Sequence, residues 1–444
     1  MDQSDDSKLD RRSFLNITAG VVAGSAIAST ARSYERILGA NDRIALGHIG
    51  IGNRGSGLHL IASQLKGKYN AEVVAVCDLW KRNLDRAVAK TQTAYGRAPR
   101  AVQYFDDLLA MKDVDAVLIA TPEHSHSPIL KATVEAGKHA YCEKPMGNVL
   151  AEVKAARDAV KQRKNLVVQI GTQHRSEPYQ LAAREVLRSG ALGDVSKYEI
   201  VWNFNGPRWR GRPQVKLIRE QDTDWKKWLM TKPDRPFDPQ LYFEFRLYKQ
   251  FSSGIPDQWM SHGIDLVHFF MNEQPPRSIV AHGGVFAWHD GRENPDTFEA
   301  LVEYPSFLVS YSTSFGNDCD SFSRIMGKKA TLVNIGGEGS PRWKVVDEKG
   351  NHEDNPTIER AERWVTLPGD TKPGPINIGD EDLSHMTNWF ECMRAGNART
   401  NATVDNGFLH SVAVIMAAQS YWQGKRLYYD AKSEQITDTA PTHS

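Results

Sequence analysis

Residues 44–55 read IALGHIGIGNRG, a short apolar run followed by glycines at Gly50, Gly52 and Gly55. This spacing predicts a buried strand, a glycine turn and the start of a helix. In such a turn the first glycine permits the tight bend, the second lets the backbone approach a pyrophosphate, and the third lets the helix pack closely on the strand. The helix N-terminus then faces the anion. The apolar face of this helix is formed by Leu58, Ile61, Ala62 and Leu65.

A second predicted strand, residues 73–77, ends at Asp78. A carboxylate at this place can accept both ribose hydroxyl groups of an adenosine, and it repels a 2′-phosphate. The pattern therefore favours NAD, while Lys81 and Arg82 nearby leave NADP as the alternative. The plainer interpretation is that Asp78 only caps the next helix.

Two further strands are predicted at residues 116–120 and 139–142, each followed by a polar loop at its carboxyl end, the edge where doubly wound sheets bind ligands. Lys144 lies in the second loop, where the nicotinamide ring is expected, although a loop lysine before a proline is often only solvated. We expect cofactor contacts from the glycine turn, the strand end and these loops, from Gly50, Gly52, Asn53, Arg54, Gly55, Asp78, Thr121, Pro122, His126, Glu143 and Lys144.

The second half of the chain has the alternating pattern of antiparallel strands. Tyr198, Ile200, Trp202 and Phe204 alternate with more polar residues, and residues 298–304 and 308–314 predict a hairpin. The fold class is therefore α/β, a doubly wound parallel Rossmann sheet followed by a domain with an antiparallel sheet.

Residues 206–250 form a long segment without a clear period, rich in Pro, Arg and Trp. Segments of this length are usually functional insertions or surface arms. Trp and Arg side chains offer stacking faces and forked donors that suit hydroxylated or carboxylated sugars. A subunit-contact arm would use the same residue types, which here are Trp225, Trp228, Arg208, Arg210, Arg212 and Arg246.

The catalytic chemistry is expected around residues 257–265, read as a helix on which Gln258 and His262 form an i, i+4 pair. A neutral imidazole next to a C–OH group can accept its proton as the hydride leaves. A lone helix histidine is more often structural. The nearest carboxylates are Asp257 and Asp265.

The first thirty or so residues differ from the rest. Arg11 and Arg12 precede a Gly/Ala-rich apolar run that ends in a small-residue cleavage pattern at residues 26–28. The leader resembles a twin-arginine export signal, whose alternative is an arginine pair that caps an amphipathic helix. Export as a folded, cofactor-loaded protein to the periplasm is expected, with no membrane insertion after cleavage.

Composition excludes several other classes. Lys and Arg total 55 against 54 Asp and Glu in 444 residues, a formal charge of +1, so no general electrostatic surface for nucleic acid or an anionic membrane is expected. The four cysteines lie far apart without zinc spacing, and no metal site is expected.

Together these motifs resemble the Gfo/Idh/MocA family of glucose-fructose oxidoreductase and inositol dehydrogenase, over nearly the whole chain after the leader. The resemblance rests on Gly50 to Gly55, the strand end at Asp78, the Thr121-Pro122 and Glu143-Lys144-Pro145 motifs, and residues 171–175 and 257–265. The chain looks especially like exported members, which share Trp225-x-x-Trp228, Arg235-Pro236-Phe237 and Leu427-Tyr428-Tyr429-Asp430.

The resemblance implies a signal peptide at 1–31, a Rossmann domain at 42–170, and an α/β domain at 171–432 with a large open, mainly antiparallel sheet. It also implies that C-terminal helices pack back on the first domain. Sugars, inositols or their derivatives would be the substrates of a dimer or tetramer. The export leader, and not the resemblance, predicts that the cofactor is held tightly, because the periplasm offers no free nucleotide to rebind.

By the same resemblance, Lys144 and His262 are the catalytic residues. The family commonly has Asp four residues before this histidine, where Gln258 stands here, and this departure puts an Asp/His dyad in doubt. The family also includes redox-cycling lyases and glycosidases, which act through a transient keto-sugar and often lack the lysine. Expected substrate contacts are Arg175, Trp225, Arg246, Asp257, Gln258 and His262.

Overall fold

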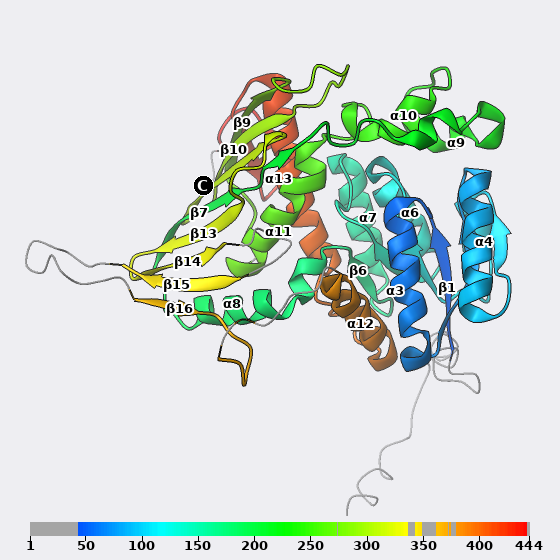
Figure 1. Ribbon diagram of the computed structural model, residues 1–444, viewed down its shortest axis with the longest axis horizontal. Coiled ribbons are helices and arrows are strands. Elements are labelled where there is room, and N and C mark those ends of the chain that lie inside the picture. The colour runs from blue at the N-terminus through cyan, green and yellow to red at the C-terminus, as the bar shows by residue number, and fades with distance from the viewer. Residues whose placement is uncertain are drawn as a thin grey trace, which may run out of the picture. The chain divides into compact units, whose positions relative to one another are not determined.

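The structure of the protein is a computed structural model, and it describes residues 43–272, 274–335, 342–348, 361–371, 373 and 379–441 (Figure 1). The predicted export signal lies outside these residues. Within them, no helix is long and apolar enough to cross a membrane.

The first sheet is the predicted doubly wound sheet. Its six strands are parallel and have the order β3-β2-β1-β4-β5-β6, so the strand order reverses between β1 and β4. Ligands of doubly wound sheets bind at such a reversal. The elements are β1 Ile44–Ile49, α3 Asn53–Tyr69, β2 Ala71–Cys77, α4 Lys81–Tyr95, β3 Arg100–Val102, α5 Phe105–Leu109, β4 Ala116–Ile119, α6 His126–Glu135, β5 His139–Cys142, α7 Leu150–Gln162 and β6 Val168–Ile170.

The strands of this sheet are apolar because both of its faces are covered. Every residue of β1, β4 and β5 is buried, as parallel sheets between helical layers require. The short 3-10 turn at Glu123–Ser125 precedes α6, so the predicted helix after Pro122 begins irregularly.

The second sheet has ten strands in the order β16-β15-β14-β13-β7-β11-β10-β9-β17-β18. The predicted hairpin is present as β10 paired antiparallel with β11, whereas β11 and β7 are parallel. The strands are β7 Val195–Val201, β9 Ser278–Gly284, β10 Thr297–Glu303, β11 Leu308–Ser314, β13 Phe322–Gly327, β14 Ala330–Asn334, β15 Trp343–Asp347, β16 Glu362–Trp364, β17 Leu427–Asp430 and β18 Gln435–Thr437; β8 Phe204–Asn205 and β12 Gly316–Asn317 form a separate pair.

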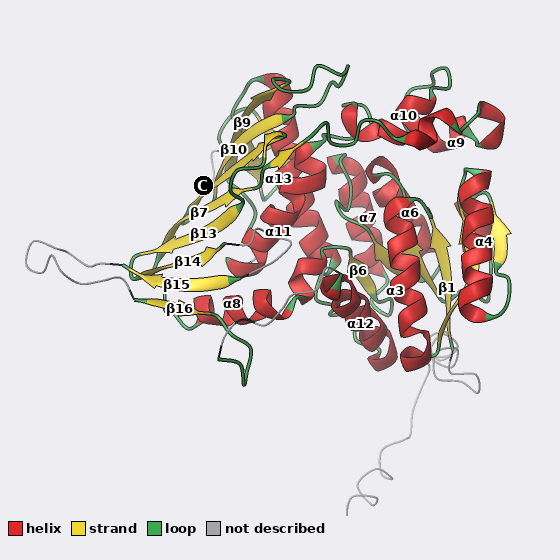
Figure 2. Cartoon of the chain, in the orientation of Figure 1, coloured by secondary structure: helices red, strands yellow, loops and turns green. Residues whose placement is uncertain are grey.

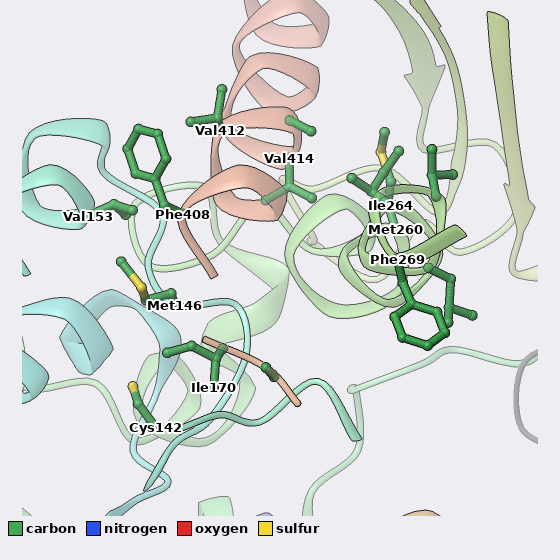
Figure 3. Close-up of a cluster of buried hydrophobic side chains, with 14 of the residues drawn as sticks. Cys142, Met146, Val153, Ile170, Met260, Ile264, Phe269, Phe408, Val412 and Val414 are labelled. Carbon is green, nitrogen blue, oxygen red and sulfur yellow. The ribbon is translucent and has the colours of Figure 1, made fainter. Parts of the chain in front are cut away.

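Helices α11 Ser261–Phe270 and α13 Val404–Gln423 lie between the large sheet and the Rossmann domain, and α8 Pro178–Arg188 lies below β15 and β16 in this view (Figures 1 and 2). Figure 3 shows how the core continues across this layer: Met146 and Ile170 of the first domain face Phe408 of α13, and Met260 and Ile264 lie beyond it. Helix α12 Asp380–Ala395 packs on the other part of the Rossmann core through Met386, Trp389, Phe390 and Met393.

The aperiodic segment forms an arm with short helices, α9 Trp225–Leu229 and α10 Pro239–Glu244. Its aromatic residues form a buried cluster with Trp80, which lies three residues after the end of β2. Trp80 meets Phe243 edge-on at 5.0 Å, and the His124 ring meets Trp228 at 4.8 Å. The arm therefore packs on the loops after β2 and β4, at the ligand-binding edge of the Rossmann sheet.

Candidate active site

The glycine turn has the geometry that a bound pyrophosphate needs. Gly50 has φ +83°, and a Cβ on Gly55 would lie 2.0 Å from the Gly50 carbonyl oxygen, so neither position accepts a side chain. A Cβ on Gly52 would meet nothing within 4 Å, which leaves the backbone open to a ligand. Helix α3 has no side-chain cap and no acidic residue in its first turn. These residues fit a dinucleotide phosphate at the helix N-terminus.

Asp78 connects the turn to the end of β2. Its carboxylate accepts hydrogen bonds from the Ile51 and Trp80 amides, each at 2.9 Å, and from the Asn83 side chain at 3.3 Å. Burial raises the pKa of Asp78 to about 6, against the effect of these donors. A carboxylate has about four acceptor positions, and three are in use, so Asp78 keeps about one for a ribose hydroxyl group.

His126 joins the two loops that follow β4 and β5. One ring nitrogen lies 2.7 Å from the Thr121 carbonyl oxygen and the other lies 2.7 Å from the Pro145 carbonyl oxygen. Its ring is buried between these loops. His126 therefore acts on the site by fixing the loop that carries Lys144, and Thr121 and Pro122 form the facing loop.

Arg54 and Glu143 form an ion-pair network. The Arg54 Nε donates to Glu143 at 2.7 Å, and its two terminal nitrogens donate to the two Asp382 oxygens at 2.6 Å. The predicted cofactor residue Arg54 thus directs its donors to two carboxylates and attaches the glycine turn to α12. Asn53, one residue earlier, is exposed at the helix start.

Lys144 extends from the β5 end toward the second domain. Its Nζ donates to the Gln258 carbonyl oxygen at 2.6 Å. Burial lowers the pKa of Lys144 to about 8, which Glu143 and Glu123 oppose and Arg246 reinforces. The side chain can therefore exchange a proton near neutral pH, as a general acid or base requires.

His262 lies close to Lys144 in the same site. Burial, and then the Lys144 charge, hold the pKa of His262 well below its ordinary value, so the imidazole is neutral. The centroid of its ring lies 5.0 Å from that of the His174 ring and 5.9 Å from that of the Trp202 ring. Its Nδ1 is buried without a hydrogen-bond partner among the described residues. A neutral ring with an unpartnered nitrogen can accept a proton.

Neither acidic neighbour of His262 in the sequence forms a dyad with it. Residues Pro256–Met260 form a π-helical turn before α11, and this turn changes the spacing that an α-helix would give. Asp257 instead accepts from the Ser253 amide at 2.8 Å, and the Gln258 amide donates to Glu123 at 2.9 Å. The predicted helix is therefore π-helical at Gln258 and α-helical at His262, and the Gln258 side chain is directed to Glu123.

Asp265, one turn later, forms a buried ion pair with Arg175 at 2.7 Å. Burial raises the pKa of Asp265, but Arg175 and His410 outweigh it and bring the value to about 2. Arg175 is 2% exposed, and its guanidinium is used in holding α11. The structure thus places this predicted substrate residue in a structural role.

Trp225 is also placed away from the reacting groups. It is 6% exposed, stacks on Trp228 at 4.9 Å and donates to the Arg235 carbonyl oxygen at 2.7 Å, all within the arm. Arg246, in contrast, lies in the site, because its charge acts on Lys144 and is acted on by Glu123.

Four residues of the site were not predicted: Glu123, His174, Trp202 and Asp382. Glu123 follows Thr121-Pro122 at a strand end, and His174 precedes Arg175 in a quoted motif, so position alone was an available signal. For Trp202 the sequence offers only the alternating pattern of a strand, which does not indicate a place in the site. Asp382 lies 328 residues from its partner Arg54, and no local pattern connects them.

Comparison with known families gives two matches. Residues 44–172 match the model described as "Oxidoreductase family, NAD-binding Rossmann fold", and residues 229–429 match "Oxidoreductase family, C-terminal alpha/beta domain". Together the two matches cover most of the described chain, all of the first sheet and all strands of the ten-stranded sheet except β7 and β18. The Rossmann domain is therefore an NAD-binding domain, which agrees with the geometry of the glycine turn.

Relatives named as glycosyl hydrolase family 109 proteins match half of the chain. One from Shewanella amazonensis is 30% identical over 239 residues, 49% of this chain and 50% of that protein, and one from Shewanella pealeana is 28% identical over 247 residues, 51% of this chain and 52% of that protein. The chain thus spans about half the length of these relatives.

Solved structures share the fold over most of the chain. A levoglucosan dehydrogenase in complex with NADH and levoglucosan has a TM-score of 0.66 at 17% identity, with 86% of this chain and 98% of that chain covered. The WlbA dehydrogenase of Bordetella pertussis, in complex with NADH and UDP-GlcNAcA, has a TM-score of 0.62 at 18% identity, with 87% and 99% covered.

Proposed function

Because the chain belongs to the Gfo/Idh/MocA oxidoreductase family, we propose that it oxidises or reduces a sugar, an inositol or a sugar derivative with NAD. The carrying observation is that Lys144, with a pKa of about 8, and the neutral His262 lie together beside the carboxyl end of β5. NAD, when bound, supplies the hydride acceptor or, in its reduced form, the donor.

The two side chains divide the proton chemistry. In the oxidation direction, the Lys144 ammonium donates a hydrogen bond to the substrate oxygen and stabilises the negative charge that develops there. The neutral His262 imidazole accepts the hydroxyl proton. Glu123 keeps the lysine protonated, and it is held in place by the Gln258 amide.

The sugar substrate is supported by what related proteins bind. Levoglucosan and L-sorbose occupy structures of levoglucosan dehydrogenase, and a nucleotide sugar occupies WlbA. In this chain, Trp202 stacks on Trp259 with ring centroids 4.6 Å apart and adjoins His262. Aromatic faces next to a polar catalytic pair are suited to a sugar ring.

A redox-cycling glycosidase or lyase is the second candidate, favoured by the family 109 relatives. In that reaction, oxidation at one carbon acidifies the neighbouring hydrogen, a glycosidic bond breaks by elimination, and the hydride returns. The presence of Lys144 favours the dehydrogenase, because the hydrolytic branch of the family often lacks this lysine.

Product analysis separates the two candidates. NAD-loaded protein is incubated with free sugars and with their methyl glycosides, and the products are identified by mass spectrometry. The dehydrogenase gives a keto-sugar, lighter than the substrate by one hydrogen molecule, together with reduced nicotinamide. A cleaved glycoside without net reduction of NAD would show that the protein is a glycosidase and not a dehydrogenase. The absence of both products would refute a reaction on sugars.

We also propose export to the periplasm by the twin-arginine route and assembly into a dimer or tetramer. The export proposal rests on Arg11 and Arg12.

The assembly proposal rests on the large sheet. Its side away from α11 carries three exposed apolar residues, Leu301, Ile335 and Trp364. Light scattering measures the molar mass of the assembly: a Leu301→Glu variant is expected to shift toward the monomer, and a monomeric wild type would contradict the proposal.

A further inference from the structure

Three arginines lie together at the edge of the proposed active site. Arg208 places its guanidinium 5.0 Å above the Phe204 ring and 5.6 Å above the Trp259 ring. Burial, Arg212 and Arg246 all lower the pKa of Arg208, so the three cations are close enough to repel one another. No carboxylate offsets this repulsion at Arg208, whereas Glu123 and Glu143 act on Arg246, so an anion bound beside Arg208 would relieve the repulsion there.

These arginines are unpaired, whereas their neighbours are paired. Arg210 forms an ion pair with Glu244, and Arg292 forms one with Asp290 at 2.7 Å. Throughout the described parts of the chain, the guanidiniums of Arg208, Arg212 and Arg246 form no ion pair and donate no hydrogen bond. The Arg246 Nε is buried and unsatisfied, a costly state for a donor that has no ligand. The arm thus has carboxylates for its structural arginines and none for this trio.

The arginine trio lies near both proposed catalytic residues, Lys144 and His262. Arg246 acts electrostatically on Lys144. Arg208 covers Trp259, which stacks on Trp202 beside His262. A sugar ring placed against these aromatic faces therefore has the catalytic pair near one part and the arginine trio near another.

We infer that the substrate is an anionic sugar and that Arg208, Arg212 and Arg246 bind its oxyanion. This inference rests on the proposed function and narrows its substrate class. The forked donors of arginine match the planar geometry of a carboxylate, which makes a sugar acid the expected ligand. A sulfate ester presents the same oxyanion chemistry, and the experiment includes it.

Steady-state kinetics and calorimetry on the NAD-loaded full chain test the subsite. The probes are D-glucuronate, D-galacturonate and D-mannuronate, the neutral hexose of each, and a glucose sulfate ester. Charge-assisted hydrogen bonds are expected to give the best acid about 10- to 100-fold higher kcat/KM than its neutral hexose. Preference for the sulfate ester over all three acids would identify sulfate as the oxyanion.

The variants are Arg208→Gln, Arg212→Gln and Arg246→Gln, with Arg246→Lys as the conservative form and Lys216→Gln as the control from the same arm. Lys216 is exposed and forms no described ion pair. Arg208→Gln and Arg212→Gln are each expected to raise KM for the acid and leave KM for the neutral hexose and the affinity for NAD unchanged. Arg246→Gln is expected to raise KM for the acid more than KM for the neutral hexose, because its charge also acts on Lys144. Arg246→Lys should recover part of the loss, and Lys216→Gln should have no effect.

Equal use of acids and neutral sugars by the wild type would overturn the subsite, as would arginine variants that lose NAD affinity. If no sugar reduces the nicotinamide, the proposed function fails, and calorimetry then decides the subsite separately. Acid binding that the Gln variants weaken would sustain it, and absence of acid binding to the wild type would refute it.

Discussion

Lys144 is the residue whose surroundings most directly control the proposed chemistry. Its ammonium loses hydration by burial, and Glu143 and Glu123 return part of that stabilisation. The pKa of about 8 therefore depends on a balance between two domains, because Gln258 of the second domain positions Glu123 of the first. Substitutions of Glu123 should therefore shift the pH dependence of turnover.

Glu123→Gln is expected to move the Lys144 titration to lower pH. The native carboxylate raises the pKa of Lys144, so its neutral isostere lets burial lower that pKa further. If the ammonium binds the substrate oxygen, turnover falls as pH rises through about 8 in the wild type and at a lower pH in the variant. The measurement is the pH profile of kcat/KM, which reports groups of the enzyme before the sugar binds. The exposed Glu135→Gln serves as control, and an unchanged profile in Glu123→Gln would separate Glu123 from the lysine.

Asp78→Ser is expected to relax the preference for NAD over NADP. The carboxylate that repels a 2′-phosphate is removed, and a hydroxyl group keeps some capacity for the ribose. Since Asp78 also accepts from the Ile51 and Trp80 amides, a loss of about 1–3 kcal/mol in unfolding free energy should accompany the change. Dissociation constants for both nucleotides check this. A wild type that binds NADP more tightly than NAD would show that the role assigned to Asp78 is wrong.

Individual site residues were predictable where they follow strand ends. Gly50 to Gly55, Asp78 and Lys144 all occupy such places, and the carboxyl ends of the parallel strands bring them to one edge of the sheet. Side-chain direction was not predictable, because it depends on partners that are distant in the chain. Arg54 turns to Asp382, and Gln258 turns to Glu123, 135 residues away.

At the scale of elements, the glycine turn and α3 offer a matched pair of substitutions. Gly55 has no room for a Cβ, whereas a Cβ on Gly57, in the same helix, meets nothing within 4 Å. Gly55→Ala is therefore expected to displace the turn, weaken NAD binding at least about tenfold and destabilise the fold, since the close contact needs backbone movement.

Gly57→Ala should leave NAD binding unchanged and stabilise the protein by about 0.5–1 kcal/mol, because alanine loses less backbone entropy in a helix. Nucleotide titration and urea unfolding of both variants give the comparison. Equal effects of the two substitutions would contradict the role given to the turn.

Most strands and helices were predictable from periodicity, because buried parallel strands and amphipathic helices have clear patterns. The hairpin of β10 and β11 is one case. Two elements were not predictable. The π-helical turn at Pro256–Met260 has the composition of an ordinary helix start, and the arm gains its order from contacts with Trp80 and His124.

For the whole molecule, we expect the cofactor to remain bound through purification. A protein exported already folded would have no free nucleotide pool in the periplasm, so its cycle must close with the cofactor in place. The position of the arm is consistent with a retained cofactor, because its aromatic cluster packs on the loops after β2 and β4, at the ligand-binding edge of the Rossmann sheet. Near-stoichiometric nucleotide in protein isolated from the periplasm, lost only slowly on dialysis, is the expected result. A fully active apo-protein that needs added NAD would argue for a dissociable cofactor.

The central claim is that Lys144 and His262 carry the proton chemistry of a nicotinamide-dependent sugar reaction. Its most direct test is a single-turnover experiment in which the best sugar acid reduces the NAD bound to the protein. The near-ultraviolet absorbance of the reduced nicotinamide monitors this step. Lys144→Met and His262→Ala should each slow this step by about 10²–10⁴-fold with nucleotide retained, while the exposed control Lys164→Met matches the wild type. Reduction at the wild-type rate in either active-site variant would contradict the account.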